Sequence, residues 1–403
     1  MRSTPYYGVI MVGIAFMLST FAFGGLGSVG VFLKPLSAEF GWSRAEVSFG
    51  YTSMALSSAF SSIILGAIAD KFGARRLALM GVFFMFVAMV LLSRMQTLWE
   101  FYFYYFLFGS LGISAVGAPL MASVGQWFTD KRGMAIGVVA AGGAFGQGVF
   151  PFLARLITSG YGWDTAYLVL GVIFLIMGLP LAWLVRESPS RIAAISNPED
   201  HSAPQDHYPM KPAEVISWLG LAILFCCQCM AVPIVHVVAL VSDMGFDPKA
   251  AASVFMVLMI SGVFGRIAGG GLCDRLGALR TYALMSLGQT VSAVWFPQIS
   301  NLIGLYGLAI VFGFFYSGVM TSLIVNLQAM TPPRMTGRAM GFGIFFGMIG
   351  MGLGGFLGGY IYDLTGNYTA AFAYASAAGV INLCVIFVIS LRLKGATAKM
   401  VSI

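Results

Sequence analysis

One arginine, Arg266, interrupts a run of about twenty uncharged residues that ends at Asp274. A charge at the centre of a bilayer costs about 2.5–3.5 kcal/mol on insertion scales, and ionisable residues at that depth usually mark a transport pathway. The alternative is a structural arginine that is satisfied by backbone carbonyls or by a neighbouring helix. Eight residues of helix place Arg266 about 12 Å from Asp274, close to the bilayer midplane. A guanidinium matches a carboxylate with two hydrogen bonds, so Arg266 is a candidate anion site that favours a monoanion.

Asp274 belongs to a loop motif that occurs twice. Residues 66–76 read GAIADKFGARR, and residues 270–280, which lie 204 positions later, read GGLCDRLGALR. The glycine and aspartate can simply make a tight turn, or the carboxylate can gain about 0.3–1 kcal/mol beside a helix N-terminus. In either case the repeat indicates a duplicated unit, an arrangement that transporters use with a substrate site between the two halves.

The composition requires a membrane around these residues. The chain has 403 residues, of which 59% are hydrophobic and 9% charged, and its mean hydropathy is +0.89. Soluble domains carry about 25% charged residues, so we predict an all-α, polytopic membrane protein. The five cysteines lie in apolar segments with no metal-site spacing, and we expect no metal and no cofactor. Without a nucleotide loop or paired intramembrane carboxylates, an enzyme is disfavoured.

Apolar runs of about 20 residues, enough to cross ~30 Å of hydrocarbon, recur twelve times. Residues 186–214 form the one long polar segment and read as a linker. We therefore predict a six-helix bundle at 1–185, a cytoplasmic linker at 186–214 and a second six-helix bundle at 215–403. The twelve runs cover residues 8–32, 46–69, 77–94, 100–125, 134–157, 164–185, 215–241, 250–273, 281–298, 302–328, 339–361 and 370–391.

The distribution of positive charge predicts the orientation. With twelve spans, sixteen of the 22 Lys and Arg residues fall on the side of the termini, five on the other side, and Arg266 lies within a span. The positive-inside rule places both termini and the linker in the cytoplasm. It also explains the net charge of +7 better than a nucleic-acid partner does. We expect a multi-pass protein of the cell membrane whose first 33 residues form a spanning helix rather than a cleaved signal.

Twelve spans in two halves, with G-x-x-x-D-[RK]-x-G-x-[RK]-[RK] between the second and third helices, resemble the major facilitator superfamily. The resemblance covers the whole chain. In that family the loop carboxylate lies against a helix N-terminus and a basic residue of the other half. The resemblance implies that Asp70 and Asp274 are cytoplasmic gate residues. It also implies that nearby basic residues assist them: Arg75, Arg76, Arg275 and Arg280.

Five shorter patterns follow one another along the chain. They are Pro119 followed by Trp127-Phe128, the segment DKRGMAIG at 130–137, the glycine-rich segment 142–148, Gly162-Trp163, and Pro233 to His236. Together they resemble the monocarboxylate transporter group and its oxalate/formate antiporter relatives. The resemblance implies that Arg266 is the substrate-binding arginine of the eighth helix.

The chain departs from that group at two positions. Animal members carry a lysine in the first helix and an aspartate one turn before the arginine, where this chain has Gly27 and Gly262. These departures argue against proton symport by that device.

Other residues at mid-helix depth are candidates to line the site. An amide that faces lipid is costly, which favours a cavity-lining role for Gln147 and Gln228. Phe145 and Tyr316 either line the cavity or pack between helices. Histidine is the side-chain type whose charge can change near neutral pH, so His236 is either a proton-coupling residue or a hydrogen-bonded structural histidine. The substrate-binding candidates are Arg266, Gln147, Phe145, Tyr316, Asn326, Gln228 and Ser28.

These features predict a secondary active transporter that moves small monocarboxylates, such as lactate- or pyruvate-like anions, by alternating access with proton coupling. The alternatives are an exchanger of oxalate- or formate-like anions and an importer of aromatic acids. A transporter-like membrane sensor is disfavoured, because the linker and tail are too short for a signalling domain. The expected partners are a small organic monocarboxylate, H⁺ and the lipid bilayer, with no nucleic acid, and we expect a functional monomer.

Overall fold

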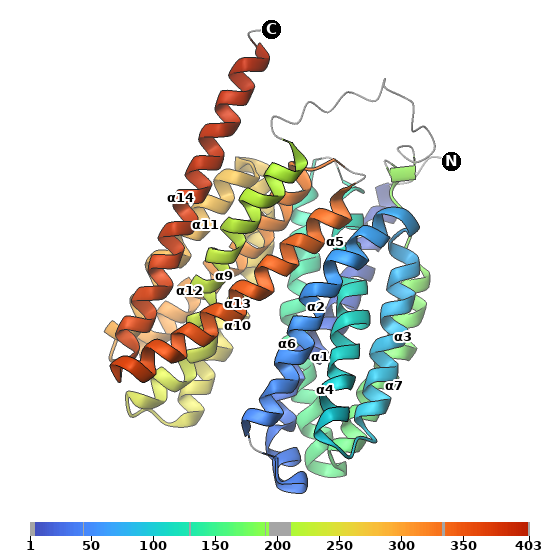
Figure 1. Cartoon of the computed structure of the whole chain (residues 1–403), viewed down its shortest axis with the longest axis vertical. Coiled ribbons are helices and arrows are strands. Elements are labelled where there is room, and N and C mark those ends of the chain that lie inside the picture. Colours follow the sequence, from blue (N-terminus) through green and yellow to red (C-terminus); the bar gives the residue numbers. More distant parts are fainter. Residues whose placement is uncertain are drawn as a thin grey trace. The chain divides into compact units, whose positions relative to one another are not determined.

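The computed structural model describes residues 5–42, 44–128, 130–189, 191–192, 211–332 and 335–401, and the regular structure in these ranges is helical (Figure 1). The elements are α1 (Pro5–Phe40), α2 (Arg44–Phe72), α3 (Ala74–Leu92), α4 (Leu98–Leu107), the π-helical η1 (Phe108–Ile113), α5 (Ser114–Gly125), α6 (Arg132–Tyr161), α7 (Trp163–Trp183), α9 (Pro212–Asp243), α10 (Pro248–Leu276), α11 (Ala278–Ala293), the short η2 (Phe296–Gln298), α12 (Leu302–Ala329), α13 (Thr336–Thr365) and α14 (Tyr368–Val401).

Eleven stretches of the described chain are long and apolar enough to cross a membrane. One of them, Leu98–Gly125, combines α4, η1 and α5. The prediction of an all-α membrane protein is therefore confirmed, but the run predicted at 281–298 is wrong in length. Its helix, α11, has 16 residues, which cover about 24 Å. The chain then turns into η2, so this span is shorter than the hydrophobic run suggested.

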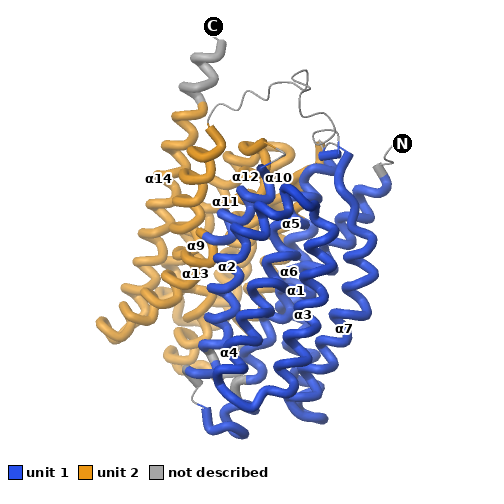
Figure 2. The backbone as a smooth tube through the Cα atoms, turned by 45° about the vertical axis from the view of Figure 1, so that its right-hand side comes forward, with its two compact units in different colours: residues 1–129, 138–198, 333–345 blue, residues 130–137, 199–332, 346–403 orange. Residues whose placement is uncertain are grey.

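The helices form two compact units (Figure 2). Unit 1 comprises residues 1–129, 138–198 and 333–345, and unit 2 comprises residues 130–137, 199–332 and 346–403. This division differs from a simple cut at the linker in two segments. The start of α6 groups with unit 2, and the start of α13 groups with unit 1. Most of the predicted linker, residues 193–210, lies outside the described residues.

Unit 1 is built around buried aromatic side chains of α1, α6 and α7. The ring of Phe174 lies 5.6 Å from that of Phe21 and 5.1 Å from that of Phe150, between ring centroids. All three side chains are at most 4% exposed. Aromatic pairs at these separations contribute beyond the area they bury, so they fix how α7 packs on its neighbours.

Unit 2 depends on close backbone contact between α10 and α12. A Cβ atom on Gly265 would lie 2.1 Å from the carbonyl oxygen of Phe314, and one on Gly313 would lie 2.2 Å from that of Leu258. Any larger residue at either glycine would force the two helices apart. Small residues permit such approaches in membrane proteins, where tight packing drives helix association.

The duplication extends to the backbone turns between helices. Gly73 and Gly277 have φ values of 85° and 86°, and Gly162 and Gly366 have φ values of 92° and 70°. The members of each pair are separated by the same 204 residues as the loop motif. Positive φ favours glycine. Each pair therefore redirects the chain at the start of an equivalent helix, and the 204-residue register holds from the second helix of each half to the sixth.

Candidate functional site

Arg266 and Tyr316 come together in unit 2. Arg266 lies on α10, and its guanidinium interacts with the side chain of Tyr316 on α12. The Tyr316 side chain is 4% exposed. Its ring stacks on Phe312, with 5.7 Å between ring centroids, and its O–H donates to the sulfur of Met259 at 3.4 Å. The tyrosine is therefore held on two sides and presents its oxygen to the arginine.

Gly262 makes room for this tyrosine. A Cβ atom on Gly262 would lie 2.5 Å from the hydroxyl oxygen of Ser317 and 3.3 Å from the hydroxyl oxygen of Tyr316. An aspartate at this position would need the space that both side chains occupy. The polar neighbour of Arg266 on this side is consequently the phenol of Tyr316, and position 262 supplies no carboxylate.

The space around Gly27 is limited as well. A Cβ atom there would lie 3.1 Å from the Cα of Gln147 and 3.3 Å from its Cγ. A lysine at position 27 would press on the backbone of α6, within unit 1. Both departures from the animal pattern thus lie where two helices approach closely and a predicted site residue fills the space.

Two further candidates in unit 2, Gln228 and Asn326, are held by hydrogen bonds. The Oε1 atom of Gln228 accepts a hydrogen bond from the hydroxyl of Tyr374 at 2.5 Å, and Gln228 is 6% exposed. Asn326 is fully buried and donates from Nδ2 to the carbonyl oxygen of Ser322 at 2.8 Å. Tyr374 was missed by the sequence analysis, because a lone tyrosine in an apolar helix gives no signal of its partner on another helix.

The candidates in unit 1 differ in exposure. Ser28 is 1% exposed and donates to the carbonyl oxygen of Gly24 at 2.8 Å, so its own helix satisfies it. Phe145 is 48% exposed, and its ring lies 6.0 Å from that of Phe16. Gln147 is half-buried against Gly27. Of these three, Phe145 and Gln147 remain accessible within their unit.

His236 binds the backbone of α13. Its Nε2 atom lies 2.9 Å from the carbonyl oxygen of Gly355, and because a carbonyl only accepts, Nε2 carries the hydrogen. The imidazole ring also lies 5.5 Å from the ring of Tyr368. These contacts tie α9 to the adjacent α13 and α14, as expected for the structural interpretation of this histidine.

Asp70 binds the first turn of α13, within unit 1. Its two carboxylate oxygens accept hydrogen bonds from the backbone N–H groups of Gly337 and Arg338, each at 2.9 Å. A Cβ atom on Gly337 would lie 2.6 Å from both Asp70 Oδ1 and the carbonyl oxygen of Gly66. The glycine therefore permits the contact, and the carboxylate satisfies N–H groups that lack a partner within the helix. We call this arrangement the first latch.

Asp274 makes the equivalent contact in unit 2, the second latch. Its carboxylate accepts hydrogen bonds from the N–H of Gly133 at 2.7 Å and of Met134 at 2.9 Å, in the first turn of α6. A Cβ atom on Gly133 would lie 2.3 Å from the carbonyl oxygen of Gly270. Gly133 and Gly337 are 204 residues apart, as are the two aspartates. The sequence analysis missed Gly337, although G-x-A-x-G occurs at both places and could have identified it.

Two side chains from the predicted linker support the first latch. Glu187 accepts a hydrogen bond from the N–H of Ala74 at 2.6 Å, at the start of α3. Arg191 donates to the carbonyl oxygen of Ala69, near the end of α2, and pairs with Glu187 at 3.2 Å. Arg191 is 8% exposed. We call Glu187 and Arg191 the brace, and both residues pack with unit 1.

The basic residues of the two loops do not pair directly with the latch carboxylates. Within the described part of the chain, none of the four predicted assistants forms an ion pair with Asp70 or Asp274. Arg75 instead lies over the ring of Trp183, 4.5 Å from its centroid. The exposed assistants are Arg76, Arg275 and Arg280.

The helix order and the two equivalent latches define a transporter of duplicated design. The sequence profile of the Major Facilitator Superfamily matches residues 13–354 and also residues 218–400. The chain belongs to this superfamily. It is a multi-pass membrane protein of the transporter class.

Individual proteins agree with this assignment. Monocarboxylate transporter 13 of Rattus norvegicus is 29% identical over 379 residues, 92% of this chain and 86% of the relative. The MFS transporter asaE of Aspergillus flavus is 28% identical over 410 residues, 98% of this chain and 88% of the relative. The fucose:proton symporter of E. coli superposes with a TM-score of 0.74 at 14% identity, over 95% of this chain and 99% of that chain. This last likeness concerns the fold.

Proposed function

We propose that this transporter moves small monocarboxylates across the cell membrane by alternating access, with Arg266 as the anchor for the carboxylate. The observation that carries the proposal is the Arg266–Tyr316 contact on α10 and α12. Two relatives whose names include monocarboxylate transport support the substrate class: the rat protein described above and a Mesocricetus auratus protein of 24% identity over 95% of this chain. Both termini are cytoplasmic in this proposal, and the working unit is one chain.

The chemistry of binding follows from the donor set. The Arg266 guanidinium can donate two parallel hydrogen bonds to a carboxylate. Tyr316 lies beside this guanidinium and is itself held by the ring of Phe312 and the sulfur of Met259. Charge-assisted hydrogen bonds are strong where water is excluded, so a monoanion at this position gains both affinity and orientation.

The two latches provide the moving contacts of alternating access. In the proposed cycle they hold the cytoplasmic side closed and release together when the substrate leaves to that side. Each consists of one carboxylate and two N–H groups, a contact that water can replace at modest cost. The rest of each unit, including the α10–α12 contact at Arg266, moves as a body.

The test of the anion anchor is uptake of radiolabelled lactate into liposomes that contain Arg266→Ala. Loss of one partner of a buried charged pair costs about 2–5 kcal/mol, which is a roughly 30-fold or larger loss of affinity. Arg155→Ala is the matched control, because Arg155 is an exposed arginine of α6. Lactate should also raise the melting temperature of the wild type but not of Arg266→Ala. Normal uptake by a folded Arg266→Ala protein would exclude the anchor.

Anion exchange is the second candidate, and the packed glycines at positions 27 and 262 favour it. Neither position carries an ionisable side chain, and a Cβ atom at either one would approach a neighbouring helix closely. His236 is then the candidate for coupling to H⁺. Counterflow of labelled lactate with and without a pH gradient distinguishes the two modes. Uptake driven by the gradient and lost in His236→Gln would establish symport, and counterflow indifferent to pH would establish exchange.

A further inference from the structure

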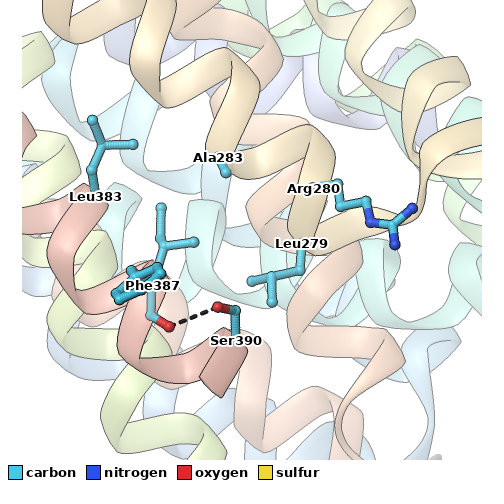
Figure 3. A pocket seen from close by; sticks show the side chains of 7 residues that line it. Leu279, Arg280, Ala283, Leu383, Phe387 and Ser390 are labelled. Atoms are coloured by element: carbon cyan, nitrogen blue, oxygen red, sulfur yellow. Dashed lines mark hydrogen bonds between the residues drawn. The ribbon is translucent and has the colours of Figure 1, made fainter. Parts of the chain in front are cut away.

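Unit 2 contains a groove between α11 and α14 with a volume of about 280 Å³. Figure 3 shows the side chains that line it. The hydroxyl of Ser390 donates to the carbonyl oxygen of Phe387 at 2.7 Å, so it is satisfied within its own helix and the walls are apolar. The groove is lined by Leu279, Arg280 and Ala283 of α11 and by Leu383, Ile386, Phe387 and Ser390 of α14.

The groove is flanked by exposed apolar side chains of α11 and α14. Leu287 of α11 is 50% exposed, and Phe387 and Leu391 of α14 are 63% and 51% exposed. Such side chains on membrane-spanning helices face lipid. The α14 residues that line the groove, from Leu383 to Ser390, extend over about 10 Å of helix. The groove is therefore long enough to hold part of one acyl chain.

One cation stands at the end of this groove. Arg280 is exposed, and no hydrogen bond or ion pair joins it to another described residue. Its aliphatic stem lines the groove, while Figure 3 shows its guanidinium directed away from Phe387 and Ser390. Arginine commonly packs its stem on apolar surface and extends its charge to the membrane interface. The neighbouring Arg392 is already paired with Glu214 at 2.5 Å.

In unit 1 the place equivalent to the groove is occupied by a side chain. The counterparts of Leu279 and Phe387, 204 residues earlier, are Arg75 and Trp183, and Arg75 lies over the Trp183 ring at 4.5 Å. A cation–π contact of this kind covers the aromatic face. In unit 2 the residue equivalent to Arg75 is Leu279, which has no charge to place over a ring. The ring of Phe387 in α14 is therefore left uncovered beside Arg280.

We propose that this groove binds an anionic phospholipid of the leaflet on the side of the repeated loops, which is the cytoplasmic leaflet in the topology proposed above. One acyl chain lies along Leu279, Leu383 and Phe387, and the lipid phosphate pairs with Arg280. The apolar walls require the acyl chain, and the unpaired cation selects an anionic headgroup. The site is independent of the identity of the transported anion.

The test measures lipid binding to the purified, delipidated full chain by native mass spectrometry and thermal shift. The probes are phosphatidylglycerol, phosphatidylcholine and inorganic phosphate. The wild type should bind phosphatidylglycerol more tightly than phosphatidylcholine, and Arg280→Gln should lose roughly fivefold of this affinity, as expected for one basic residue near the interface. Arg280→Lys should retain most of it. Arg76→Gln changes the equivalent residue of unit 1 and should have no effect.

A second variant tests the groove itself. Leu279→Arg should place a guanidinium over Phe387, as Arg75 lies over Trp183, and lower the affinity for both phospholipids. Equal binding of the two lipids by the wild type would overturn the proposal. Equal losses in Arg76→Gln and Arg280→Gln would show a diffuse charge effect instead of a site, and inorganic phosphate that protects as well as phosphatidylglycerol would show a free-anion site.

Discussion

The two repeated loops make the same contact with different support. In each, an aspartate at the end of one helix accepts two backbone hydrogen bonds from the first turn of a distant helix, at 2.7–2.9 Å. Behind Asp70, Glu187 caps the start of α3 and Arg191 binds the end of α2. Behind Asp274, the position equivalent to Glu187 is Leu391, which is 51% exposed.

The difference shows which part of the design the duplication preserved. The carboxylate, the turn glycine and the glycine of the receiving helix recur at a constant spacing, because close backbone contact tolerates little variation. The charged side chain of Glu187 is not repeated at position 391, so the brace holds only the first loop. We therefore expect the first loop to be the more rigid of the two and the second to depend more on its latch alone.

The largest loss of uptake should come from substitution of the equivalent glycine in each latch, Gly133 or Gly337. Gly133→Ala and Gly337→Ala each place a Cβ atom against backbone, 2.3 Å from the carbonyl oxygen of Gly270 and 2.6 Å from that of Gly66. Backbone cannot rotate away, so we expect a cost of about 1–3 kcal/mol and a roughly tenfold loss of uptake in both. Hydrogen exchange in the first turns of α6 and α13 should rise.

Gly148→Ala is the control for this experiment, because a Cβ atom at that glycine of α6 meets nothing within 4 Å. It should leave uptake unchanged. A normal Gly133→Ala protein would show that the second latch does not require the close approach seen here, and would remove the equivalence between the loops.

Removal of the brace should have the next largest effect and should affect one loop only. Glu187→Gln weakens the cap on the N–H of Ala74 and the pair with Arg191, which together contribute about 1–3 kcal/mol. Hydrogen exchange should accelerate at the start of α3 and stay unchanged at the start of α11. Glu214→Gln breaks an exposed ion pair and should cost under about 1 kcal/mol. Equal acceleration in both loops would contradict a brace confined to unit 1.

The smallest effect should come from the latch carboxylates themselves. Asp70→Asn and Asp274→Asn each keep one acceptor and lose the charge, which is worth about 0.3–1 kcal/mol at a helix N-terminus. We expect the larger loss of uptake in Asp274→Asn, because the first loop keeps its brace. In a Glu187→Gln background the two substitutions should become equivalent. A larger effect of Asp70→Asn in the wild-type background would reverse the proposed order of support.

The sequence alone was sufficient for the membrane class, the approximate spans and the duplicated loop. Hydropathy is a property of about twenty consecutive residues, and a repeat at constant spacing is visible without coordinates. The same information identified Arg266, because a charge in an apolar run is conspicuous. The length of α11 was overestimated, because an apolar run does not reveal where a helix turns into a loop.

Only the tertiary structure shows which side chains contact one another. The contact of Tyr316 with Arg266, the place of Gly262 beside Ser317 and the brace on the first loop each join residues that are distant in the chain. No local pattern encodes such a distance, and a polar side chain in an apolar helix has the same sequence signal whether it faces a cavity or a neighbour. The chain itself therefore determined which residues carry charge in the membrane, and only the packing of the helices decided what each charge meets.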